Sequence, residues 1–447
     1  MIEFFLETMR KSPEHEAVVA DSLRITYGEL LQEIASLEAW IEKENIPAGA
    51  VVSFNGDYSA SAIALFMALA NNHNIVVPLS NDSRAHFDEF RAIAQTEYDI
   101  SLDDGECVAH KTGRDANHEH YQALREVRHP GLVLFSSGST GKSKGIVQDL
   151  SLLMRKFKTP RKSLRMLIFL QLDHIGGVNS LLFALANKGT VIVANDRSPE
   201  SVCEAIQNHR AQVLPTSPTF LNLLLLSGIH TRYDLSSLTL ITYGTEPMQQ
   251  STLARLNDVF PNTQFQQTYG LSEVGILRSK SKDPGSLWVK VGGQEFDVKV
   301  VDGTLRIRSE SAMLGYLNAP SPFDEEGFMD TEDLVEQQGE WIRILGRKSE
   351  IINVGGAKVF PAEVESTLLE MHEVEDAVVY GESHPITGKI VVAKIKPTGA
   401  MTPREMKLRV RQFCTDKMNS YKVPSKILLT EDTTYNERFK RMRRDVK

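Results

Sequence analysis

The sequence predicts an α/β fold, in which a large N-terminal domain of helix-covered, mostly parallel sheets plus a β-rich subdomain precedes a small α+β C-terminal domain. Three observations support this prediction. The chain has 447 residues, whereas single hydrophobic cores stop growing near roughly 250 to 300 residues. Short apolar runs alternate with stretches of helical period over more than half of the chain. The pattern then changes twice, near residues 285 and 346.

The first part of the chain alternates predicted helices and strands. Thr26 and Glu29 have capping-box spacing, and the apolar residues after them recur at helical period, which predicts a helix over residues 27–45. Strands are predicted at residues 51–54, 75–79 and 131–137, and helices at residues 60–70 and after Ser83. This order is typical of a parallel sheet that is covered by helices.

The alternation continues and then gives way to shorter strands. Strands are predicted at residues 190–194, 211–215 and 238–244, and helices at residues 198–210 and 219–226. From about Gly285, strands such as residues 296–301 and 304–309 are separated by Gly and Asp, which predicts the β-rich subdomain. Beyond Gly346, a Gly-rich joint leads into a strand–helix–strand unit. We therefore place the domain boundary near Ser349, with domains at residues 1–348 and 349–447.

Composition and charge exclude several classes of protein. The formal net charge of −8 provides no basic field for nucleic acid, and the longest apolar stretch, residues 61–70, is too short for a membrane span. Cys107, Cys203 and Cys414 are far apart and predict neither a disulfide framework nor a zinc site, so we expect a cytoplasmic protein. The basic residues after Pro403 suit an acidic partner or a phosphate-bearing ligand, and a solvated charged terminus is an equal alternative. The oligomeric state is open.

A Ser-, Thr- and Gly-rich turn follows the strand at residues 131–137 and predicts a phosphate-binding loop. Backbone N–H groups, hydroxyl groups and the Lys144 ammonium can together hold an anion. The loop residues are Ser136, Ser137, Gly138, Ser139, Thr140 and Gly141. Two features disfavour a Walker A loop: Ser136 replaces the first glycine, and the β-branched Ile146 and Val147 predict a strand after Lys144. Without further context, an ordinary surface hairpin is the alternative.

Three later segments give the loop a context: YGTEPM at residues 243–248, QTYGLSEVG at residues 267–275 and MDTEDLVEQQGEWIRILGR at residues 329–347. Together with SSGSTGKSKG at residues 136–145, they resemble, in order and spacing, the motifs of the adenylate-forming enzymes. That family includes acyl- and aryl-CoA ligases, luciferases and the adenylation domains of peptide synthetases. The resemblance covers nearly the whole chain and is closest to the acyl- and aryl-CoA ligases.

The resemblance implies a binding site for ATP and Mg²⁺. In such a site, the loop steadies the β- and γ-phosphates, with Lys144 as the family's lysine and Ser143 where proline is usual. Thr268 contacts the α-phosphate, and Glu273 holds Mg²⁺ on the phosphates, with Ser272 in the place of a threonine. The nucleoside would be bound by the remaining motif residues: Gly244, Thr245 and Glu246 at adenine, Tyr269 beside them, Asp333 at both ribose hydroxyls, and Arg347 at ribose and phosphate.

The resemblance also implies a two-step reaction on a carboxylic acid. The carboxylate attacks the α-phosphate, so the site needs positive charge and N–H donors where negative charge gathers on phosphorus. The acyl-AMP formed is then opened by a thiol, which belongs either to CoA or to the phosphopantetheine of an acyl carrier protein. The sequence does not decide between these two acceptors.

The chain departs from the family pattern at its C-terminus. The family's C-terminal lysine is matched by Arg438 or, with a shift of two residues, by Lys440. Arg is not equivalent to Lys, because its guanidinium is a wide planar fork. Ser349 takes the place of the usual hinge residue, about which the mobile C-terminal domain would swing. INVGGAKVFPAEVE resembles the loop that lines the pantetheine tunnel, with Gly355 and Gly356 giving close backbone approach.

These departures keep two rival hypotheses open. In one, adenylation is weakened and only the thioester half-reaction remains; in the other, the fold only binds a nucleotide or an acyl ligand. A Walker-type NTPase is a weaker rival, which the loop sequence already disfavours.

The acid pocket is predicted near QLDHIGGVNSLLFAL, which resembles the family's acyl-pocket motif. It makes His174 the gate for the carboxylate, next to Gly176 and Gly177, although a lone histidine beside apolar residues can also be part of a core. Asp173 is expected to point elsewhere, so no carboxylate is available for a substrate ammonium and the acid should lack an α-amino group. Further pocket residues are predicted to be Ser217, Phe220 and Tyr243.

Overall fold

The computed structural model describes residues 1–21, 23–103, 106–137, 142–432 and 435. Two seven-stranded sheets form most of the N-terminal part. Both are parallel at the centre; the first has an antiparallel strand at one edge, and the second has antiparallel strands at both edges. In the first sheet the order is β13 (Gln264–Gln267), β12 (Leu240–Tyr243), β11 (Val213–Thr216), β9 (Arg165–Leu167), β10 (Thr190–Val193), β1 (Glu16–Ala20) and β2 (Leu23–Thr26). In the second it is β20 (Gly315–Tyr316), β8 (Ser143–Asp149), β7 (Gly131–Ser137), β4 (Ile75–Leu79), β3 (Val51–Asn55), β5 (Tyr98–Asp103) and β6 (Glu106–Lys111).

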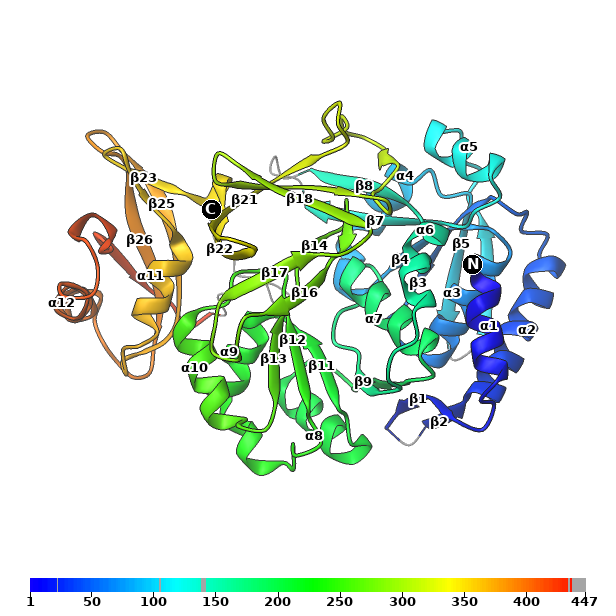
Figure 1. The fold of residues 1–447 in the computed structure, drawn as a ribbon, viewed down its shortest axis with the longest axis horizontal. Coiled ribbons are helices and arrows are strands. Elements are labelled where there is room, and N and C mark those ends of the chain that lie inside the picture. Colours follow the sequence, from blue (N-terminus) through cyan, green and yellow to red (C-terminus); the bar gives the residue numbers. More distant parts are fainter. Residues whose placement is uncertain (22, 104–105, 138–141, 433–434, 436–447) are drawn as a thin grey trace.

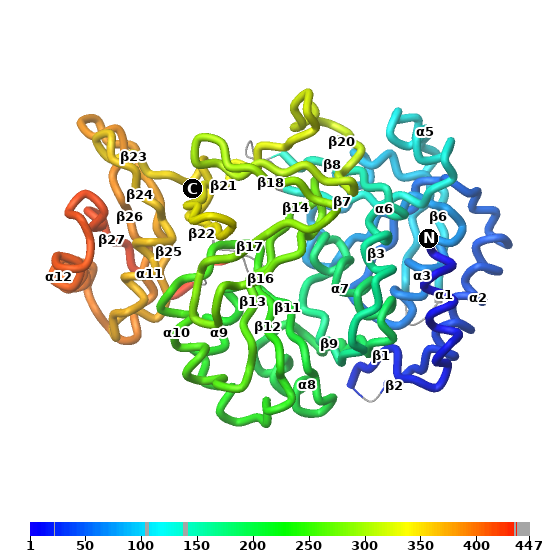
Figure 2. The backbone as a smooth tube through the Cα atoms, in the orientation of Figure 1, coloured from blue at the N-terminus to red at the C-terminus, as the bar shows by residue number. Residues whose placement is uncertain are grey.

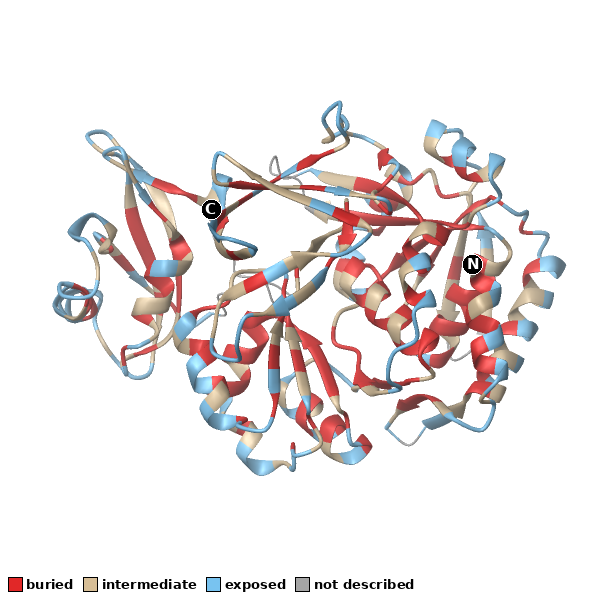
Figure 3. Cartoon of the chain, viewed as in Figure 1, coloured by how far each residue is buried: buried red, intermediate tan, exposed pale blue. Residues whose placement is uncertain are grey.

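Period-two alternation buries both faces of each sheet. In β3, Val52 lies in the core between the sheets, whereas its neighbour Val51 lies in the core on the outer face. In β10, Val191 likewise lies in the core between the sheets, whereas Ile192 lies in the core on the outer face of its sheet. Burial on both faces is the usual state of parallel strands, because crossover helices cover both sides. Figure 3 shows the buried residues running along the strands and along the sides of the helices that face them.

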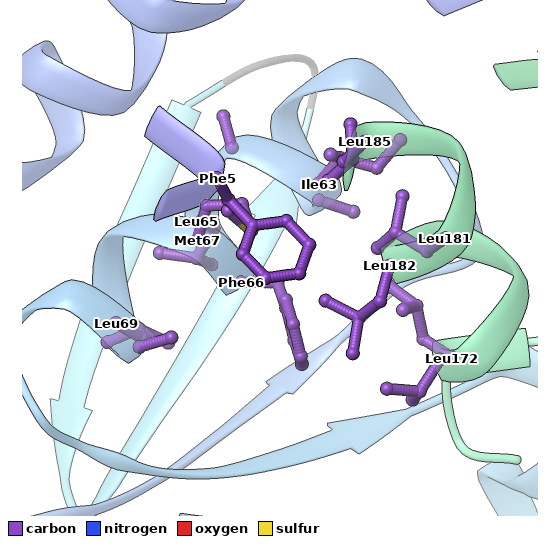
Figure 4. Packing of buried hydrophobic residues seen from close by; sticks show 14 of the residues in the cluster. Phe5, Ile63, Leu65, Phe66, Met67, Leu69, Leu172, Leu181, Leu182 and Leu185 are labelled. Atoms are coloured by element: carbon purple, nitrogen blue, oxygen red, sulfur yellow. The ribbon is translucent and has the colours of Figure 1, made fainter. Parts of the chain in front are cut away.

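Helices fill the space between the sheets and cover their outer faces. Between the sheets lie α1 (Ile2–Arg10), α3 (Ala60–Asn71) and α7 (Ile175–Ala186), where Phe5, Phe66 and Leu182 pack together (Figure 4). The remaining helices of the N-terminal part are α2 (Tyr27–Lys43), α4 (Phe87–Ile93), α5 (Glu119–Glu126), α6 (Leu150–Arg155), α8 (Pro199–His209), α9 (Pro218–Ser227) and α10 (Gln250–Val259). No helix formed by the described residues has both the length and the apolar character needed to cross a membrane.

A β-rich region follows β13 in the chain. Its six-stranded antiparallel sheet contains β16 (Arg278–Ser281), β17 (Trp288–Gly292), β22 (Trp341–Arg347), β21 (Met329–Gln338), β19 (Thr304–Ser309) and β18 (Phe296–Val301). A two-stranded ribbon, β14 (Gly270–Leu271) with β15 (Gly275–Ile276), precedes it. Figure 1 shows this region between the parallel sheets and the C-terminal part.

The C-terminal part has its own sheet and its own core. The sheet consists of β23 (Ile352–Val354), β24 (Ala357–Val359), β25 (Val374–His384), β26 (Gly388–Pro397) and β27 (Lys426–Leu429), and it packs with α11 (Pro361–Leu368) and α12 (Pro403–Cys414). The chain passes from β22 into this sheet at β23 (Figure 2). The connection contains the short 3-10 helix Lys348–Glu350, which includes Ser349. The domain boundary near Ser349 stays a prediction.

The predicted fold class is confirmed, and most predicted elements lie where expected. The Thr26 capping box forms, and the helix that it starts ends at Lys43. The strands predicted at residues 75–79 and 131–137 have those bounds. The predicted helix after Ser83 begins as a 3-10 turn at residues 81–86 and becomes an α-helix at Phe87.

Candidate active site

The predicted phosphate loop connects two antiparallel strands, β7 and β8. Ser136 lies opposite Lys144, and Ser137 lies opposite Ser143. The tip residues Gly138, Ser139, Thr140 and Gly141 lie outside the described residues. Lys144 is part of β8, so the strand predicted after the loop is confirmed and no helix begins at this lysine as a Walker A loop requires.

The strand that carries Lys144 is held on its second side by β20. Gly315 and Tyr316 pair with Val147 and Ile146 of β8. Beyond the pairing, the Asn318 side chain accepts a hydrogen bond from Gly145 N–H (3.1 Å) and donates one to the Ser143 carbonyl (2.8 Å). These contacts fix the base of the loop through a segment about 170 residues away in the chain.

Lys144 and Glu273 meet at the side chain of Tyr316. The Lys144 Nζ lies 4.8 Å from the centre of the Tyr316 ring. The Tyr316 hydroxyl donates a 2.8 Å hydrogen bond to Glu273 Oε1, and the Glu273 carbonyl accepts one of 2.7 Å from Met313 N–H. Two residues predicted from separate motifs are thus brought together by a third that sequence reasoning missed.

A second group of side chains surrounds Asp333. The Tyr269 hydroxyl donates a 2.6 Å hydrogen bond to Asp333 Oδ2, and Arg347 Nε lies 3.4 Å from Asp333 Oδ1. Asp333 and Arg347 are directly opposite on β21 and β22. Burial raises the pKa of Asp333, and the Arg347 charge opposes that rise. Burial lowers the pKa of Arg347, but neighbouring groups, Asp333 first and then Tyr269, Glu273 and Glu350, together outweigh burial and raise it. Glu273 therefore lies close enough to Arg347 for the two groups of side chains to interact electrostatically.

The predicted adenine segment lies at the carboxyl ends of two neighbouring parallel strands. β12 ends at Tyr243 and β13 at Gln267, so Gly244 and Thr268 follow adjacent strand ends. Both the N–H and the hydroxyl of Thr268 donate to the Tyr243 carbonyl (2.7 and 3.1 Å). A Cβ at Gly244 would lie 2.6 Å from Thr268 Oγ1, so only glycine allows this approach.

The two residues after Gly244 shape the same turn. Thr245 has a φ of +72°, which is uncommon for a residue other than glycine. Glu246 Oε1 accepts a 2.8 Å hydrogen bond from Thr219 N–H, in the first turn of α9. A carboxylate at a helix N-terminus is favourably placed for the helix dipole.

His174 precedes α7 at the predicted acid pocket and is partly exposed. Asp173 points inward, as expected: its Oδ2 accepts hydrogen bonds from the hydroxyls of Ser80 and Ser83, each 2.7 Å long. Gly177 is needed for packing, because a Cβ there would lie 2.0 Å from the Gln171 carbonyl oxygen. A Cβ at the partly exposed Gly176 would lie 2.7 Å from the Leu170 side chain.

Ser217, Phe220 and Tyr243 lie in the core behind the strand ends. Each is at most 1% exposed. Ser217 Oγ caps α9 by accepting from Phe220 N–H (3.1 Å), and the Phe220 ring lies 4.4 Å from that of Phe169. Their contribution to an acid pocket stays a prediction.

Gly355 and Gly356 form the two-residue turn between β23 and β24. Val354 pairs with Ala357, and the two glycines have φ values of +57° and +90°. Such a turn requires positive φ at both central positions. A Cβ at either would meet nothing within 4 Å, so the backbone angle, not crowding within this chain, demands glycine. Ser349 is exposed, and Arg438 and Lys440 lie outside the described residues.

Two family models match the chain. The model described as "AMP-binding enzyme" matches residues 82–317, which is more than half of the chain, and the model described as "AMP-binding enzyme C-terminal domain" matches residues 363–440. The chain belongs to the AMP-binding enzyme family.

Among the curated relatives of this AMP-binding enzyme are CoA ligases. Acyl-CoA synthetase 7 of Caenorhabditis elegans is 30% identical over 293 residues, which cover 58% of this chain and 54% of that protein. A 4-coumarate–CoA ligase of Pinus taeda is 27% identical over 359 residues, covering 71% and 66%. The chain thus spans between about half and two thirds of the length of these relatives.

Solved structures share the fold of this AMP-binding enzyme. An anthranilate CoA ligase in complex with anthranoyl-AMP has a TM-score of 0.81 at 18% identity, covering 96% of this chain and 93% of that one. The o-succinylbenzoate CoA synthetase of Bacillus subtilis, in complex with its acyl-adenylate intermediate, has a TM-score of 0.78 at 20% identity, covering 98% and 96%.

Proposed function

We propose that this AMP-binding enzyme activates a carboxylic acid with ATP as an acyl-AMP and transfers the acyl group to a thiol. The proposal depends on one observation: charged residues from three separate motifs lie close enough together to interact. These residues are Lys144, Glu273, Asp333 and Arg347. A single hairpin or a single carboxylate would not support a nucleotide reaction, but this combination of groups does.

ATP fits the residues of this site. Asp333 offers a carboxylate that two ribose hydroxyls can share, and Arg347 beside it carries the positive charge that a phosphate needs. The backbone at Gly244 approaches Thr268 without a side chain between them. In the proposed site, adenine would lie against the Gly244 turn and the Thr268 hydroxyl would contact the α-phosphate. The β7–β8 loop with Lys144 would hold the β- and γ-phosphates.

Mg²⁺ fits at Glu273. The Tyr316 hydroxyl occupies Oε1, whereas no described residue donates a hydrogen bond to Oε2. Mg²⁺ is usually bound by one or two carboxylates together with substrate phosphates and water. That mode agrees with the described residues, which contain no cluster of three or more His, Cys, Asp or Glu side chains suited to a metal. When bound, the ion neutralises phosphate charge.

The proposed first step forms a bond between an oxygen of the acid and the α-phosphorus, and it breaks the bond from that phosphorus to pyrophosphate. Both reactants are anions, so Arg347 and Lys144 lower the barrier by supplying fixed positive charge. Thr268 orients the α-phosphate. In the second step, a thiolate attacks the acyl carbon, and AMP leaves with its electron pair.

The acid is proposed to be an aryl or acyl acid without an α-amino group. Asp173, the acidic residue next to His174, is buried and accepts from Ser80 and Ser83. A buried substrate ammonium would lack a counter-charge there, which costs several kcal/mol. The names of one relative and two structural neighbours agree with an acid that contains an aromatic ring, since 4-coumarate, anthranilate and o-succinylbenzoate each contain one.

The thiol belongs either to CoA or to a carrier-protein phosphopantetheine. The names of the relatives favour CoA. The Gly355–Gly356 turn is proposed to line the path of the pantetheine arm after the C-terminal domain rotates about Ser349. Comparing the rates of thioester formation with CoA and with a carrier protein that bears a free phosphopantetheine thiol decides between the two acceptors.

An exchange assay tests the proposed function. Labelled pyrophosphate is incubated with ATP, the full chain and panels of aryl, fatty and amino acids. We expect exchange with aryl or acyl acids and thioester formation once CoA is added. Better exchange with amino acids would overturn the substrate class. ATP binding without exchange for any acid would favour a protein that only binds nucleotide, and phosphate release from ATP without acid would favour an NTPase.

Arg438 supports one alternative, in which adenylation is weak and thioester formation persists. Two substitutions test it. If Arg438 occupies the place of the lysine, Arg438→Lys should raise the exchange rate. If instead Lys440→Ala abolishes exchange and Arg438→Lys leaves it unchanged, Lys440 is the lysine and the alternative fails.

A further inference from the structure

Tyr316 contacts both Lys144 and Glu273, which were predicted from separate motifs. We propose that Tyr316 is a positioning residue, whose hydroxyl orients the Glu273 carboxylate and whose ring restrains the Lys144 ammonium at the phosphate end of the site. The inference rests on the proposed function, because it assumes that Mg²⁺ and ATP phosphates bind there. It adds a residue that belongs to none of the four predicted motifs.

The backbone of Tyr316 is locked to the strand that carries Lys144. Tyr316 pairs with Ile146, which is two residues from Lys144, and Leu317 N–H donates to the Gly145 carbonyl (2.8 Å). Asn318 then binds Ser143 and Gly145. These contacts fix the place of Tyr316 relative to the base of the loop.

The segment before Tyr316 is packed closely from behind. A Cβ at Gly315 would lie 2.2 Å from Nε2 of His120, so this position has no room for a side chain. Tyr316 itself is only 7% exposed. A side chain enclosed in this way has few alternative rotamers, and its hydroxyl can hold a partner in one orientation.

Glu273 is held at both ends. Met313 N–H binds its carbonyl at 2.7 Å, and the Tyr316 hydroxyl binds Oε1 at 2.8 Å. With Oε1 engaged, Oε2 is the oxygen that remains for a metal. Fixing the carboxylate before the ligand arrives removes the entropy cost of orienting it during binding.

The hydroxyl and the ring have separable roles, which two substitutions distinguish. Tyr316→Phe keeps the ring under Lys144 and removes only the bond to Glu273, whereas Tyr316→Leu removes both contacts. Tyr27→Phe is the matched control, since the Tyr27 hydroxyl makes a buried 2.6 Å bond to the Gly189 carbonyl, a backbone contact outside the site. Thermal unfolding and circular dichroism establish that all three variants are folded.

Calorimetric titration of the full chain with ATP, at fixed and at varied Mg²⁺ concentration and without acid, provides the first readout. We expect Tyr316→Phe to weaken Mg²⁺-dependent ATP binding about tenfold, as for a lost hydrogen bond to a charged group. Tyr316→Leu should weaken it further, and Tyr27→Phe should leave it unchanged.

A double-mutant cycle provides the second readout. If the Tyr316 hydroxyl acts through Glu273, Tyr316→Phe should have no further effect in a Glu273→Gln background. A merely structural role would weaken binding by the same factor in both backgrounds, and that result would overturn the inference. Equal Mg·ATP binding by wild type and Tyr316→Phe would overturn it as well.

Pyrophosphate exchange distinguishes failure of this inference from failure of the proposed function. If the wild type exchanges pyrophosphate and Tyr316→Phe exchanges it at the same rate, only the inference fails. If the wild type binds no Mg·ATP, the proposed function fails too.

Discussion

The Tyr269 hydroxyl donates a 2.6 Å hydrogen bond to the carboxylate of Asp333, 64 residues later in the chain. Tyr269 precedes the ribbon that leads to Glu273, and Asp333 lies on β21 opposite Arg347. Burial raises the pKa of Tyr269 well above its usual value, and the Asp333 charge adds to the rise, so the phenol stays a donor at neutral pH. This pair connects the proposed phosphate and ribose ends of the site.

Asp333→Asn should weaken ATP binding without lowering the free energy of unfolding at pH 7. Burial raises the pKa of the Asp333 carboxyl above its ordinary 3.8, so its charge opposes folding at neutral pH. The variant should be at least as stable as wild type at pH 7 in urea unfolding, and any advantage should vanish as the pH falls below 3.8. ATP binding by calorimetry should weaken about 10- to 100-fold, because one charged acceptor is lost. Unchanged ATP affinity would remove Asp333 from the ribose site.

Lys144 and Lys142 form a matched pair of lysines on one loop. Lys142 is exposed, whereas Lys144 lies over the Tyr316 ring. Lys144→Ala should lower acid-dependent pyrophosphate exchange about 100-fold, as for removal of one oriented donor. Lys142→Ala should change it by about twofold or less. A larger effect at Lys142 would mean that the wrong lysine has been assigned to the phosphates.

Gly244→Ala should disturb Thr268. The added methyl group would lie 2.6 Å from Thr268 Oγ1, so the hydroxyl must leave the Tyr243 carbonyl. We expect a loss of about 1–3 kcal/mol in stability, as for overpacking, and a lower exchange rate. Gly285→Ala is the control, since a Cβ there meets only Asp283 at 3.9 Å. If both variants behaved alike, close approach at Gly244 would not matter.

Lys156 gives the protein a pH dependence at alkaline pH. Burial lowers its pKa from 10.5 to about 8, against the opposing charge of Glu295. The folded protein therefore binds this proton less tightly than the unfolded chain, so the charged amine opposes folding below pH 8 and the cost disappears between about pH 8 and 10.5.

Lys156→Met should remove that cost. We expect the variant to be about 1–2 kcal/mol more stable than wild type at pH 7. This is a net value, because the variant also loses the hydrogen bond from Lys156 to the Ile276 carbonyl. The difference in stability should shrink as the pH rises to 10.5. The exposed Lys158→Met is the control and should show no such trend. Urea unfolding across this range measures both. A constant difference would contradict the assigned burial.

Local patterns in the sequence predicted the fold well, because its elements are encoded by short-range chemistry. Three features depend only on neighbouring residues: the capping box at Thr26, the apolar strand at residues 75–79 and the hairpin that carries Lys144. The strand predicted at residues 238–244 corresponds to β12, whose carboxyl end precedes Gly244. The neighbouring β13, which ends just before Thr268, was not predicted.

Contacts between distant residues could not be predicted in the same way. Tyr316 binds Glu273, which is 43 residues away in the chain, and Asn318 binds Ser143, which is 175 residues away. Neither Tyr316 nor Asn318 belongs to one of the four motifs of the predicted site. The apolar pattern around Phe220 does not distinguish a pocket wall from a core; its side chain is fully buried, and its contribution to an acid pocket stays a prediction. Tertiary packing decides which distant residues meet, and local patterns do not encode it.

The fate of the acid's oxygen tests the proposed chemistry most directly. An aryl acid labelled with ¹⁸O in both carboxylate oxygens is incubated with ATP, Mg²⁺, CoA and the full chain, and the nucleotides are analysed by mass spectrometry. If the carboxylate attacks the α-phosphorus and the thiol then attacks the acyl carbon, AMP must carry one ¹⁸O and pyrophosphate none. Unlabelled AMP, or ADP in its place, would contradict adenylation at this site.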